Sequence, residues 1–226
     1  MTTILITGTG RGIGLELAKQ ALARGWTVYG SARSPVSDPA AHICDHPQFH
    51  DLVFDVTDHA AVRAAAASID APIDILINNA GIIGPQHQST LDMDFDGFAE
   101  TLAVNTLAPL AVTQAFLPNL RRSSNPRVVT ISSRMGSMSH SSSDRIAYRA
   151  SKAAVNKVMQ GLASDLRGAG IAVVSMHPGW VRTDMGGKAA DITPQQSAAG
   201  ILAIADRLTM QQSGHFINWD GAELAW

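Results

Sequence analysis

Residues 3–14 read TILITGTGRGIG, and this stretch decides the fold. A short apolar strand over 3–7 runs directly into a glycine-rich loop, which opens a helix predicted over 12–24. Glycines here allow a tight turn, and they let backbone N–H groups approach a pyrophosphate at the start of the helix. The stretch predicts a dinucleotide-binding unit, although a plain tight turn would need glycine too. The residues expected at the cofactor are Gly8, Arg11, Gly12, Ile13 and Gly14.

The same alternation of strand, loop and helix continues along the chain. Apolar strands are expected at 26–32, 51–55, 73–77, 127–132, 171–177 and 214–218, and helices at 58–69, 97–121, 146–167 and 194–209. This alternation predicts a parallel sheet covered on both faces by helices. Right-handed crossovers then give an α/β fold, a doubly wound, Rossmann-like parallel sheet of about seven strands in three α/β/α layers. We expect a single dinucleotide-binding domain over 1–226, with a small substrate region at about 180–226.

The composition argues against several classes of function. The chain has 226 residues, 46% of them hydrophobic, and a net charge of −2 at pH 7, with no run of five like charges. This balance predicts neither a nucleic-acid face nor a membrane-surface patch. No apolar run reaches the roughly 18 residues of a membrane span, and the start reads as a first strand, not a signal peptide. The single cysteine, Cys44, allows no intrachain disulfide and suits a cytoplasmic protein.

The end of the second strand indicates which dinucleotide is preferred. Folds selective for NAD usually place an acidic side chain about 20 residues past the loop, where it bonds the ribose 2′-hydroxyl. Here Arg33 follows the strand instead. Arg33 and Arg11 can clamp a 2′-phosphate, because guanidinium offers a fork of donors to phosphate oxygens. NADP(H) is therefore expected over NAD, unless both arginines are simply solvated.

Two further turns are placed to meet the cofactor. Asp55, at the end of the third strand, can accept from the adenine amino group, with Val56 beside the ring. The alternative role for Asp55, capping the next helix, suits Asp58 or Thr57 better. The turn 78–81 (NNAG) follows the fourth strand, and its small residues allow close passage of the cofactor, while a purely structural role is equally open. The contacts expected there are Asn79, Ala80 and Gly81.

Tyr148 and Lys152 are four residues apart, so they share one face of the helix expected over 146–167. A tyrosine has a pKa of about 10, and it exchanges a proton near neutral pH only when its anion is stabilised, as a nearby ammonium would do. The spacing alone is common in helices without such a role. Its place after a serine-bearing loop, in a fold with a dinucleotide loop, favours a catalytic pair in which Tyr148 handles the proton.

Two more positions are candidates for the reaction. Ser132 and Ser133 end the fifth strand at the edge that faces the ligand crevice, where a hydroxyl can donate to a substrate carbonyl oxygen or merely cap a turn. Pro109 has no N–H, so the carbonyl of Asn105 loses its usual helical partner. A free carbonyl inside a helix favours a kink or an inserted water, and such a water would link Lys152 to solvent as a proton path.

The ordered set of motifs resembles the short-chain dehydrogenases/reductases over nearly the whole chain. The motifs are TGTGRGIG at 7–14, NNAG at 78–81, Asn105, ISS at 131–133, YRASK at 148–152 and HPGWVRTDMGG at 177–187. Within that family the chain is similar to the C-factor-like carbonyl reductases. That likeness is carried by ISSRMGS at 131–137, YRASKAAVN at 148–156 and the tail SGHFINWDGAELAW at 213–226.

The resemblance implies the catalytic set Asn105, Ser133, Tyr148 and Lys152. Tyr148 would be the general acid in reduction, Ser133 would orient the carbonyl, and Lys152 would also hold the nicotinamide ribose. Tyr148 would contact the cofactor as well, and further cofactor contacts would be Pro178, Gly179, Val181 and Thr183. The loop from Ser133 to Tyr148 is about two residues longer than is usual in the family, which keeps Ser132 open as the alternative. The chain is short after Thr183, which predicts an open pocket and permissive substrate choice.

The motifs together predict an NADP(H)-dependent oxidoreductase that interconverts an aldehyde or ketone and an alcohol, both small molecules. The alternative is a dinucleotide-binding signalling protein of C-factor type with little turnover, and a methyltransferase with a similar sheet would explain only the glycine loop. No metal is expected, because the spacing of the loop ligands matches no usual zinc pattern. Those ligands are His42, Cys44, His46 and His50. In the family the long helices, here 97–121 and 146–167, often form an interface, so a homodimer or homotetramer is expected.

Overall fold

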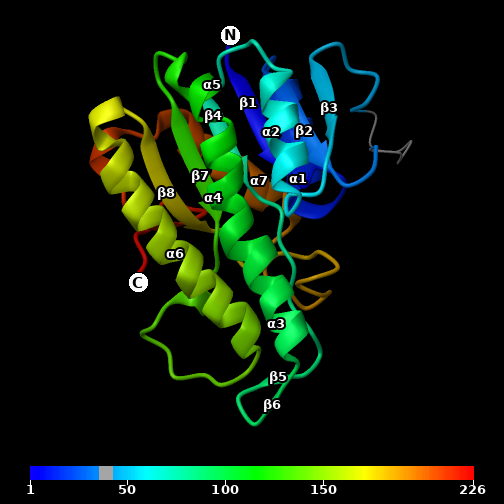
Figure 1. The fold of residues 1–226 in the computed structure, drawn as a ribbon, viewed down its shortest axis with the longest axis vertical. Helices are drawn as coiled ribbons and strands as arrows, with labels where there is room; N and C mark the ends of the chain where they lie inside the picture. The colour runs from blue at the N-terminus through cyan, green and yellow to red at the C-terminus, as the bar shows by residue number, and fades with distance from the viewer. Residues whose placement is uncertain (36–42) are drawn as a thin grey trace.

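The computed structural model describes residues 1–35 and 43–226, which form three layers (Figure 1). The central sheet has seven parallel strands in the order β3-β2-β1-β4-β7-β8-β9. Their bounds are β1 Thr3–Thr7, β2 Thr27–Ala32, β3 Phe49–Val53, β4 Ile75–Asn78, β7 Arg127–Ile131, β8 Ala172–His177 and β9 Phe216–Asn218. After β3 the chain returns to pair β4 with the other side of β1. The predicted doubly wound α/β sheet is therefore confirmed.

Helices cover both faces of this sheet. In Figure 1, α2, α4 and α6 lie in front of the strands, and α7 lies behind them, where it packs against α1. The bounds are α1 Gly12–Ala23, α2 His59–Ala67, α3 Phe95–Leu102, α4 Ala108–Ala115, α5 Leu117–Arg121, α6 Ile146–Leu166 and α7 Pro194–Arg207. Within residues 1–35 and 43–226, no helix has both the length and the apolar content needed to cross a membrane.

Strand β1 shows why the strands read as unbroken apolar runs. Ile4 and Ile6 belong to the core cluster shared with α1 and α7, while Leu5 belongs to the cluster shared with α2, α4 and α6. Successive side chains of a strand point to opposite faces of the sheet, so a strand covered on both faces needs apolar residues throughout. This double burial fixes the strand ends from which the functional loops project.

Two features of the sheet region differ from the sequence prediction. β3 begins at Phe49 and ends at Val53, earlier than the strand expected at 51–55. Of the loop predicted over 34–50, residues 36–42 lie outside the described part of the chain. A small antiparallel pair, β5 Gln88–Ser89 with β6 Asp92–Met93, was not predicted, because strands this short show no periodicity.

The long helix predicted over 97–121 is broken at two places. A π-helical segment, Ala103–Leu107, separates α3 from α4, and Phe116 separates α4 from α5. Pro109 and Pro118 lie in the first turns of α4 and α5, where a helix tolerates the missing N–H. The interruption predicted at Pro109 is thus present as the π segment just before it, and the second break follows from Pro118. Single π-helical turns often occur at functional sites.

Candidate active site

The carboxyl ends of the central strands bring the predicted motifs to one edge of the sheet. The glycine loop follows β1, the turn 78–81 follows β4, the serines 132–133 follow β7, and residues 178–183 follow β8. Doubly wound sheets bind ligands at this edge, at the point where the strand order reverses, here between β1 and β4. Segments that are far apart in the sequence therefore line one crevice.

The glycine loop has the backbone geometry that a pyrophosphate requires. Gly8 and Gly12 have φ angles of 78° and 58°, in the region that favours glycine. A Cβ on Gly14 would lie 2.0 Å from the carbonyl oxygen of Gly8, so the loop closes onto α1 only without a side chain there. Arg11, which precedes α1, gives no side-chain cap, and the first turn has no acidic residue. The start of α1 therefore fits an anionic group.

The turn after β4 is tied to the glycine loop by its own hydrogen bonds. The Asn79 amide donates to the carbonyl oxygens of Thr7 and Gly8 at 2.9 and 3.2 Å. The Thr7 hydroxyl accepts from the backbone N–H groups of Asn79 and Ala80 at 3.0 and 3.1 Å. A Cβ on Gly81 would lie 3.1 Å from the Asn105 Oδ1. The turn thus has a structural role in this structure, and it also forms a narrow wall of the crevice.

The acidic residues near the expected adenine site have separate tasks. Of the two caps that the sequence left open, Asp58 and Thr57, Asp58 caps α2 by accepting from two backbone N–H groups. Asp55 accepts from the backbone N–H and the hydroxyl of Thr57 at 2.8 and 2.7 Å, and these bonds lower the pKa of its carboxyl. Arg33 is exposed and contributes to the same lowering through its charge. Asp55 and Arg33 therefore lie in one neighbourhood at the ends of β2 and β3.

Arg11, the other arginine expected at the 2′-phosphate, lies in an ion pair across the mouth of the crevice. Its Nη1 is 2.7 Å from the Asp184 Oδ2, and both side chains are 79% exposed. Ion pairs as exposed as this contribute little to stability and are screened by salt. The pair can therefore open at low cost when another anion competes for Arg11.

The residues after β8 close the crevice from the opposite side. Gly179 has a φ angle of 87°, and a Cβ there would lie 2.5 Å from Ile192. Ser197 on α7 donates to the carbonyl oxygen of Pro178 at 2.7 Å. A Cβ added to Gly12 would lie 3.4 Å from the Cγ2 of Thr183, so these two residues face each other. Thr183 thus lies beside Gly12 of the glycine loop, while Pro178 and Gly179 contact Ser197 and Ile192, and their expected contacts with the cofactor stay a prediction. Val181 is buried beside them and bridges to Ile192.

Tyr148 and Lys152 lie buried on the crevice side of α6. The Lys152 Nζ donates to the carbonyl oxygen of Ile131 at 2.8 Å and lies 5.7 Å from the centre of the Tyr148 ring. Burial lowers the pKa of the Lys152 ammonium to about 8, so the charged form still prevails at neutral pH. Burial raises the pKa of the Tyr148 phenol, and the Ser133 hydroxyl and the charge of Arg145 oppose that rise. Tyr148 is therefore a protonated acid with groups nearby that favour its anion.

The structure separates the two serines at the end of β7. The Ser132 hydroxyl donates to the carbonyl oxygen of Lys152 at 3.4 Å, so it points at the backbone of α6. Ser133 interacts with the Tyr148 phenol, and its hydroxyl also accepts from the backbone N–H of Met135 at 3.2 Å. Of the two alternatives that the sequence left open, Ser133 is the one beside the tyrosine.

Asn105 joins the π-helical segment to the rest of the site through its side chain. Its Oδ1 accepts from the backbone N–H of Ile82 at 2.9 Å, and its Nδ2 donates to the Ile82 carbonyl at 2.8 Å. The same Nδ2 donates to the Ser151 hydroxyl at 3.0 Å, and that hydroxyl donates to the carbonyl of Tyr148 at 2.7 Å. The amide thus ties the loop after β4 to α6. The water path from the Asn105 carbonyl to Lys152 stays a prediction.

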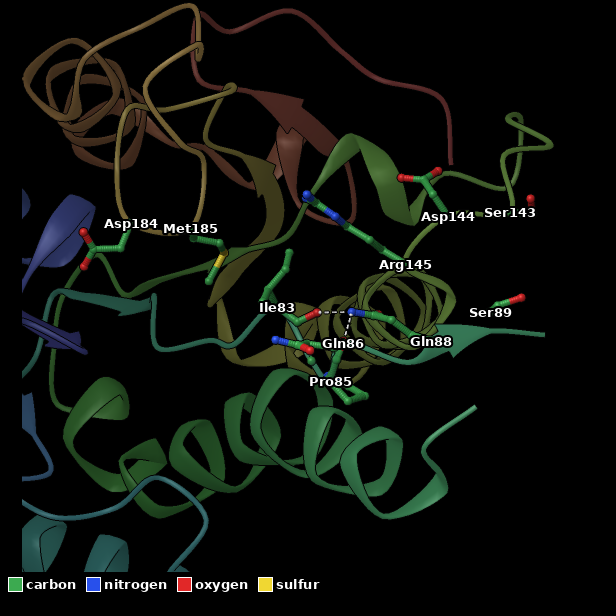
Figure 2. Close-up of a pocket in the computed structure, with 11 residues that line it drawn as sticks. Ile83, Pro85, Gln86, Gln88, Ser89, Ser143, Asp144, Arg145, Asp184 and Met185 are labelled. Atoms are coloured by element: carbon green, nitrogen blue, oxygen red, sulfur yellow. Dashed lines mark hydrogen bonds between the residues drawn. The ribbon is translucent and has the colours of Figure 1, made fainter. Parts of the chain in front are cut away.

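A cavity of about 390 Å³ borders the start of α6 at Arg145 (Figure 2). Its walls come from the loop after β4, the loop before α6 and the loop after β8. The lining residues are Ile83, Gly84, Pro85, Gln86, Gln88, Ser89, Ser143, Asp144, Arg145, Asp184 and Met185. The volume is in the range of pockets that hold small molecules. The described residues contain no group of three or more His, Cys, Asp and Glu side chains able to hold a metal, and His42 lies outside them.

Gln88 is a residue of this site that the sequence analysis missed. Its Oε1 accepts from the backbone N–H of Tyr148 at 3.1 Å, in the uncapped first turn of α6. Its Nε2 donates to the carbonyl oxygens of Ile83 and Pro85 at 3.1 and 2.6 Å, as the dashed lines in Figure 2 show. Gln88 thus positions both the start of the tyrosine helix and one wall of the cavity. Only the three-dimensional structure brings residues 88 and 148 together, so no local pattern announces the role.

We expect Gln88→Glu and Gln88→Met each to lower kcat/KM for carbonyl reduction about five- to tenfold, the size of one or two lost hydrogen bonds. Glutamate keeps the acceptor for the Tyr148 N–H but cannot donate to the loop carbonyls, and its charge raises the pKa of the phenol. The alkaline limb of the pH–rate profile should therefore move upward in Gln88→Glu alone. If both variants lower thermal stability but keep the wild-type pH profile and rate, Gln88 serves only the fold.

His177 ends β8 just before the crevice, and its charge state is set by its surroundings. The imidazole is buried, and Nδ1 has no hydrogen-bond partner among the described residues. Burial, reinforced by the charge of Arg134, lowers the pKa of His177 from 6.5 to about 4. Between these values the unfolded chain binds a proton that the folded chain does not. Stability therefore falls as the pH falls from 6.5 through 4.

We expect the free energy of unfolding to drop by about 2 kcal/mol on this account between pH 7 and pH 5. His177→Gln, which carries no titrating group, should lack that part of the drop. Denaturant unfolding at both pH values, with wild type and variant side by side, measures the difference. An identical pH dependence in the two proteins would show that His177 titrates as it does in the unfolded chain.

Known proteins resemble this chain in sequence and in fold. The family model described as short chain dehydrogenase matches residues 2–193. The chain is 41% identical over 167 residues to C-signal of Myxococcus xanthus, an alignment that covers 73% of this chain and 100% of that protein. It is 34% identical over 235 residues to 1-hydroxy-2-glutathionyl-2-methyl-3-butene dehydrogenase of Rhodococcus sp. (strain AD45), with 100% of both chains covered.

A solved structure extends the likeness to three dimensions. The NADPH-bound carbonyl reductase from chicken fatty liver has a TM-score of 0.92 with this structure at 34% identity, and the match covers 100% of this chain and 99% of that one. Identity of this size over whole chains shows common descent as well as a common fold. The sheet order, the glycine loop and the buried Tyr148–Lys152 pair agree with that descent, and the chain belongs to the short-chain dehydrogenase family of oxidoreductases.

Proposed function

We propose that the protein is an NADPH-dependent carbonyl reductase that converts an aldehyde or ketone into an alcohol. The observation that carries this proposal is the buried Tyr148, with Ser133 at its phenol and Lys152 near its ring, at the crevice that also contains the glycine loop. A site that only binds a dinucleotide has no need of a buried, protonated phenol with a serine hydroxyl and an ammonium around it. In the reaction a carbonyl compound, NADPH and a proton become an alcohol and NADP⁺.

The proposed cofactor site uses the backbone of the crevice. The bound dinucleotide supplies the hydride and, after oxidation, a positive ring. The uncapped start of α1 would hold the pyrophosphate, and Arg33 with Arg11 would hold the 2′-phosphate. Asp55 and Val56 would border the adenine, with Asn79, Ala80 and Gly81 along the ribose side. Gly8, Gly12, Ile13 and Gly14 fit on one wall, and Pro178, Gly179, Val181 and Thr183 on the other.

The proposed chemistry assigns one task to each side chain of the catalytic set. Tyr148 donates its proton to the substrate oxygen as negative charge develops there, and Ser133 donates a hydrogen bond to the same oxygen. Lys152 holds its positive charge near the phenol and so stabilises the tyrosinate that remains. Asn105 positions the helix through Ser151 and is therefore a positioning residue in this structure.

The direct test of this proposal is NADPH oxidation by the purified protein against a panel of aldehydes and ketones. The alcohol product is identified by mass spectrometry, with NADH in parallel. We expect turnover of several small carbonyl compounds with NADPH, because the cavity is open to solvent on the loop side. Tight binding of NADPH without turnover of any compound would contradict the enzyme assignment.

We expect Arg33→Asp to reverse the cofactor preference. An aspartate at this position repels a 2′-phosphate and accepts from a 2′-hydroxyl, so the affinity for NADPH should fall about ten- to a hundredfold, while that for NADH rises. Fluorescence titration of both dinucleotides measures the two affinities. Arg207→Asp, the same charge reversal at the far end of α7, is the control and should change neither. An unchanged ratio in Arg33→Asp would remove Arg33 from the site.

A second function is favoured by one specific observation, the 41% identity to C-signal. In that alternative the chain binds the dinucleotide as a signalling or regulatory protein with little turnover. The two functions differ in their dependence on Tyr148. A signalling activity that survives Tyr148→Phe, in a protein with no measurable reduction of carbonyl compounds, would favour the alternative.

We also propose that the protein acts in the cytoplasm as a homodimer or homotetramer. The exposed apolar side chains of Leu107 and Phe95 lie on and beside the helices that the sequence analysis assigned to an interface. Light scattering after gel filtration measures the mass in solution. A species of 23.9 kDa at working concentration would be a monomer and would contradict the proposed assembly.

A further inference from the structure

The cavity beside Tyr148 has one charged side chain that is not balanced by an ion pair. Three charged residues line it: Asp144, Arg145 and Asp184. The Asp144 carboxylate is 2.7 Å from the guanidinium of Arg149, and the Asp184 carboxylate is 2.7 Å from that of Arg11. Arg145 forms no ion pair and no side-chain hydrogen bond with any residue of 1–35 or 43–226. While these two pairs are closed, Arg145 is the charged lining residue that has no ion-pair partner among the described residues.

The backbone holds Arg145 in an unusual conformation at this place. Its φ angle is 51°, and among the described residues it is the one non-glycine residue with a positive φ. L-residues with a large side chain rarely adopt this region, and such strained residues cluster at functional sites. Figure 2 shows the Arg145 side chain reaching from the start of α6 toward the side of the cavity where Ile83 and Met185 lie.

Arg145 is also related to Tyr148, both by its place in the sequence and by the effect of its charge. It precedes Tyr148 by three residues, and its charge opposes the burial that raises the pKa of that phenol. The opposite wall is formed by the apolar side chains of Ile83, Pro85 and Met185. The cavity thus combines an apolar wall with a guanidinium, and its lining residue Gln88 accepts from the backbone N–H of Tyr148.

We propose that Arg145 is the anion-binding residue of the substrate site, and that the preferred substrates are aldehydes or ketones that carry a carboxylate. The guanidinium fork matches the two oxygens of a carboxylate, and the apolar wall covers the carbon skeleton between carboxylate and carbonyl. This inference rests on the proposed carbonyl reduction and adds the class of substrate. Arg145 is a specificity-determining residue in this account, and the proton still comes from Tyr148.

The test compares 4-carboxybenzaldehyde with its neutral methyl ester, methyl 4-formylbenzoate. We expect Arg145→Gln to lower the ratio of kcat/KM for acid over ester about tenfold or more, the loss of one hydrogen-bonded charge pair. The ratio is compared between proteins, so the different intrinsic reactivities of the two aldehydes cancel. Arg145→Asn provides a second variant that tolerates the left-handed backbone, and Arg145→Lys should restore part of the preference. Arg134→Gln, a nearby charge outside the lining, should leave the ratio unchanged.

Binding provides a readout that does not depend on turnover. Isothermal titration of 4-carboxybenzaldehyde into the complex of protein and NADP⁺ should show weaker binding in both Arg145 variants, with the ester unaffected. Equal ratios and equal affinities in wild type and Arg145→Asn would overturn the inference while leaving carbonyl reduction intact. A protein that binds the acid through Arg145 but reduces neither aldehyde would keep the anion site and refute the proposed reaction. An equal loss in Arg134→Gln would show a general charge effect and overturn the role of Arg145.

Discussion

Tyr148→Phe should lower kcat/KM for carbonyl reduction about a hundred- to ten-thousandfold, the range lost when a positioned general acid is removed. Phenylalanine keeps the ring that packs on α6 but has no proton to donate. The affinity for NADPH should fall far less, because phenylalanine keeps the ring and only the hydroxyl is lost. Steady-state kinetics on the best substrate of the panel, together with fluorescence titration of NADPH, separates the two effects.

Because Tyr148 is buried, the experiment needs a check that the variant still folds and a comparison with Ser133→Ala. Tyr148→Phe removes one buried hydroxyl and keeps the aromatic ring, so the variant should remain folded. Ser133→Ala should cost less than Tyr148→Phe, because it removes a hydrogen bond to the substrate oxygen and leaves the proton donor in place. If Tyr148→Phe reduces the substrate as fast as wild type, the proton comes from another group.

Gly14→Ala should weaken NADPH binding at least about a hundredfold, the effect expected when a binding loop is displaced by about 1 Å. The added Cβ would lie 2.0 Å from the carbonyl oxygen of Gly8 and 2.5 Å from the Nδ2 of Asn79, so the loop has to move. Gly8 and Asn79 belong to the hydrogen-bonded contact between the loop after β1 and the turn after β4. The displacement would therefore shift the wall of the pyrophosphate site.

Gly10→Ala is the matched control in the same loop. A Cβ on Gly10 would be 3.8 Å from the Cβ of Ala32, an ordinary contact, and its backbone does not have a positive φ. This variant should bind NADPH like wild type. Equal losses in the two variants, or no loss in Gly14→Ala, would show that the close approach of loop and helix is not what shapes the cofactor site. Circular dichroism and thermal melts distinguish loss of binding from loss of the fold.

The parts of the fold that the sequence predicted well are those governed by local rules. Strands buried on both faces need continuous apolar runs, and the glycines at 8, 12 and 14 are needed by positive φ angles or a close contact. Helical periodicity predicts that Tyr148 and Lys152 share one helix face, and the surrounding motifs made them a candidate pair. The cap of α2 was narrowed to Asp58 or Thr57 because capping depends on residues within one turn, and the structure shows Asp58.

The parts that could not be predicted depend on contacts between distant segments. Gln88 meets the N–H of Tyr148 across sixty residues of chain, and a glutamine between loop residues has no pattern of its own. Arg145 is recognised as unusual only through its left-handed backbone, which the sequence does not show for an arginine. The choice between Ser132 and Ser133 depends on which hydroxyl meets the backbone of α6 and which meets the Tyr148 phenol. In the structure Ser132 bonds to the carbonyl oxygen of Lys152, and Ser133 lies at the phenol.

The central claim is that hydride passes from NADPH to a substrate carbonyl while Tyr148 supplies the proton. Incubation of the protein with a reducible aldehyde and NADPH deuterated on the transferring face of the nicotinamide tests it most directly. Mass spectrometry of the product should find an alcohol with one deuterium on the former carbonyl carbon, and Tyr148→Phe should form it far more slowly. An alcohol without deuterium from either face-labelled NADPH, or no alcohol despite bound NADPH, would contradict the claim.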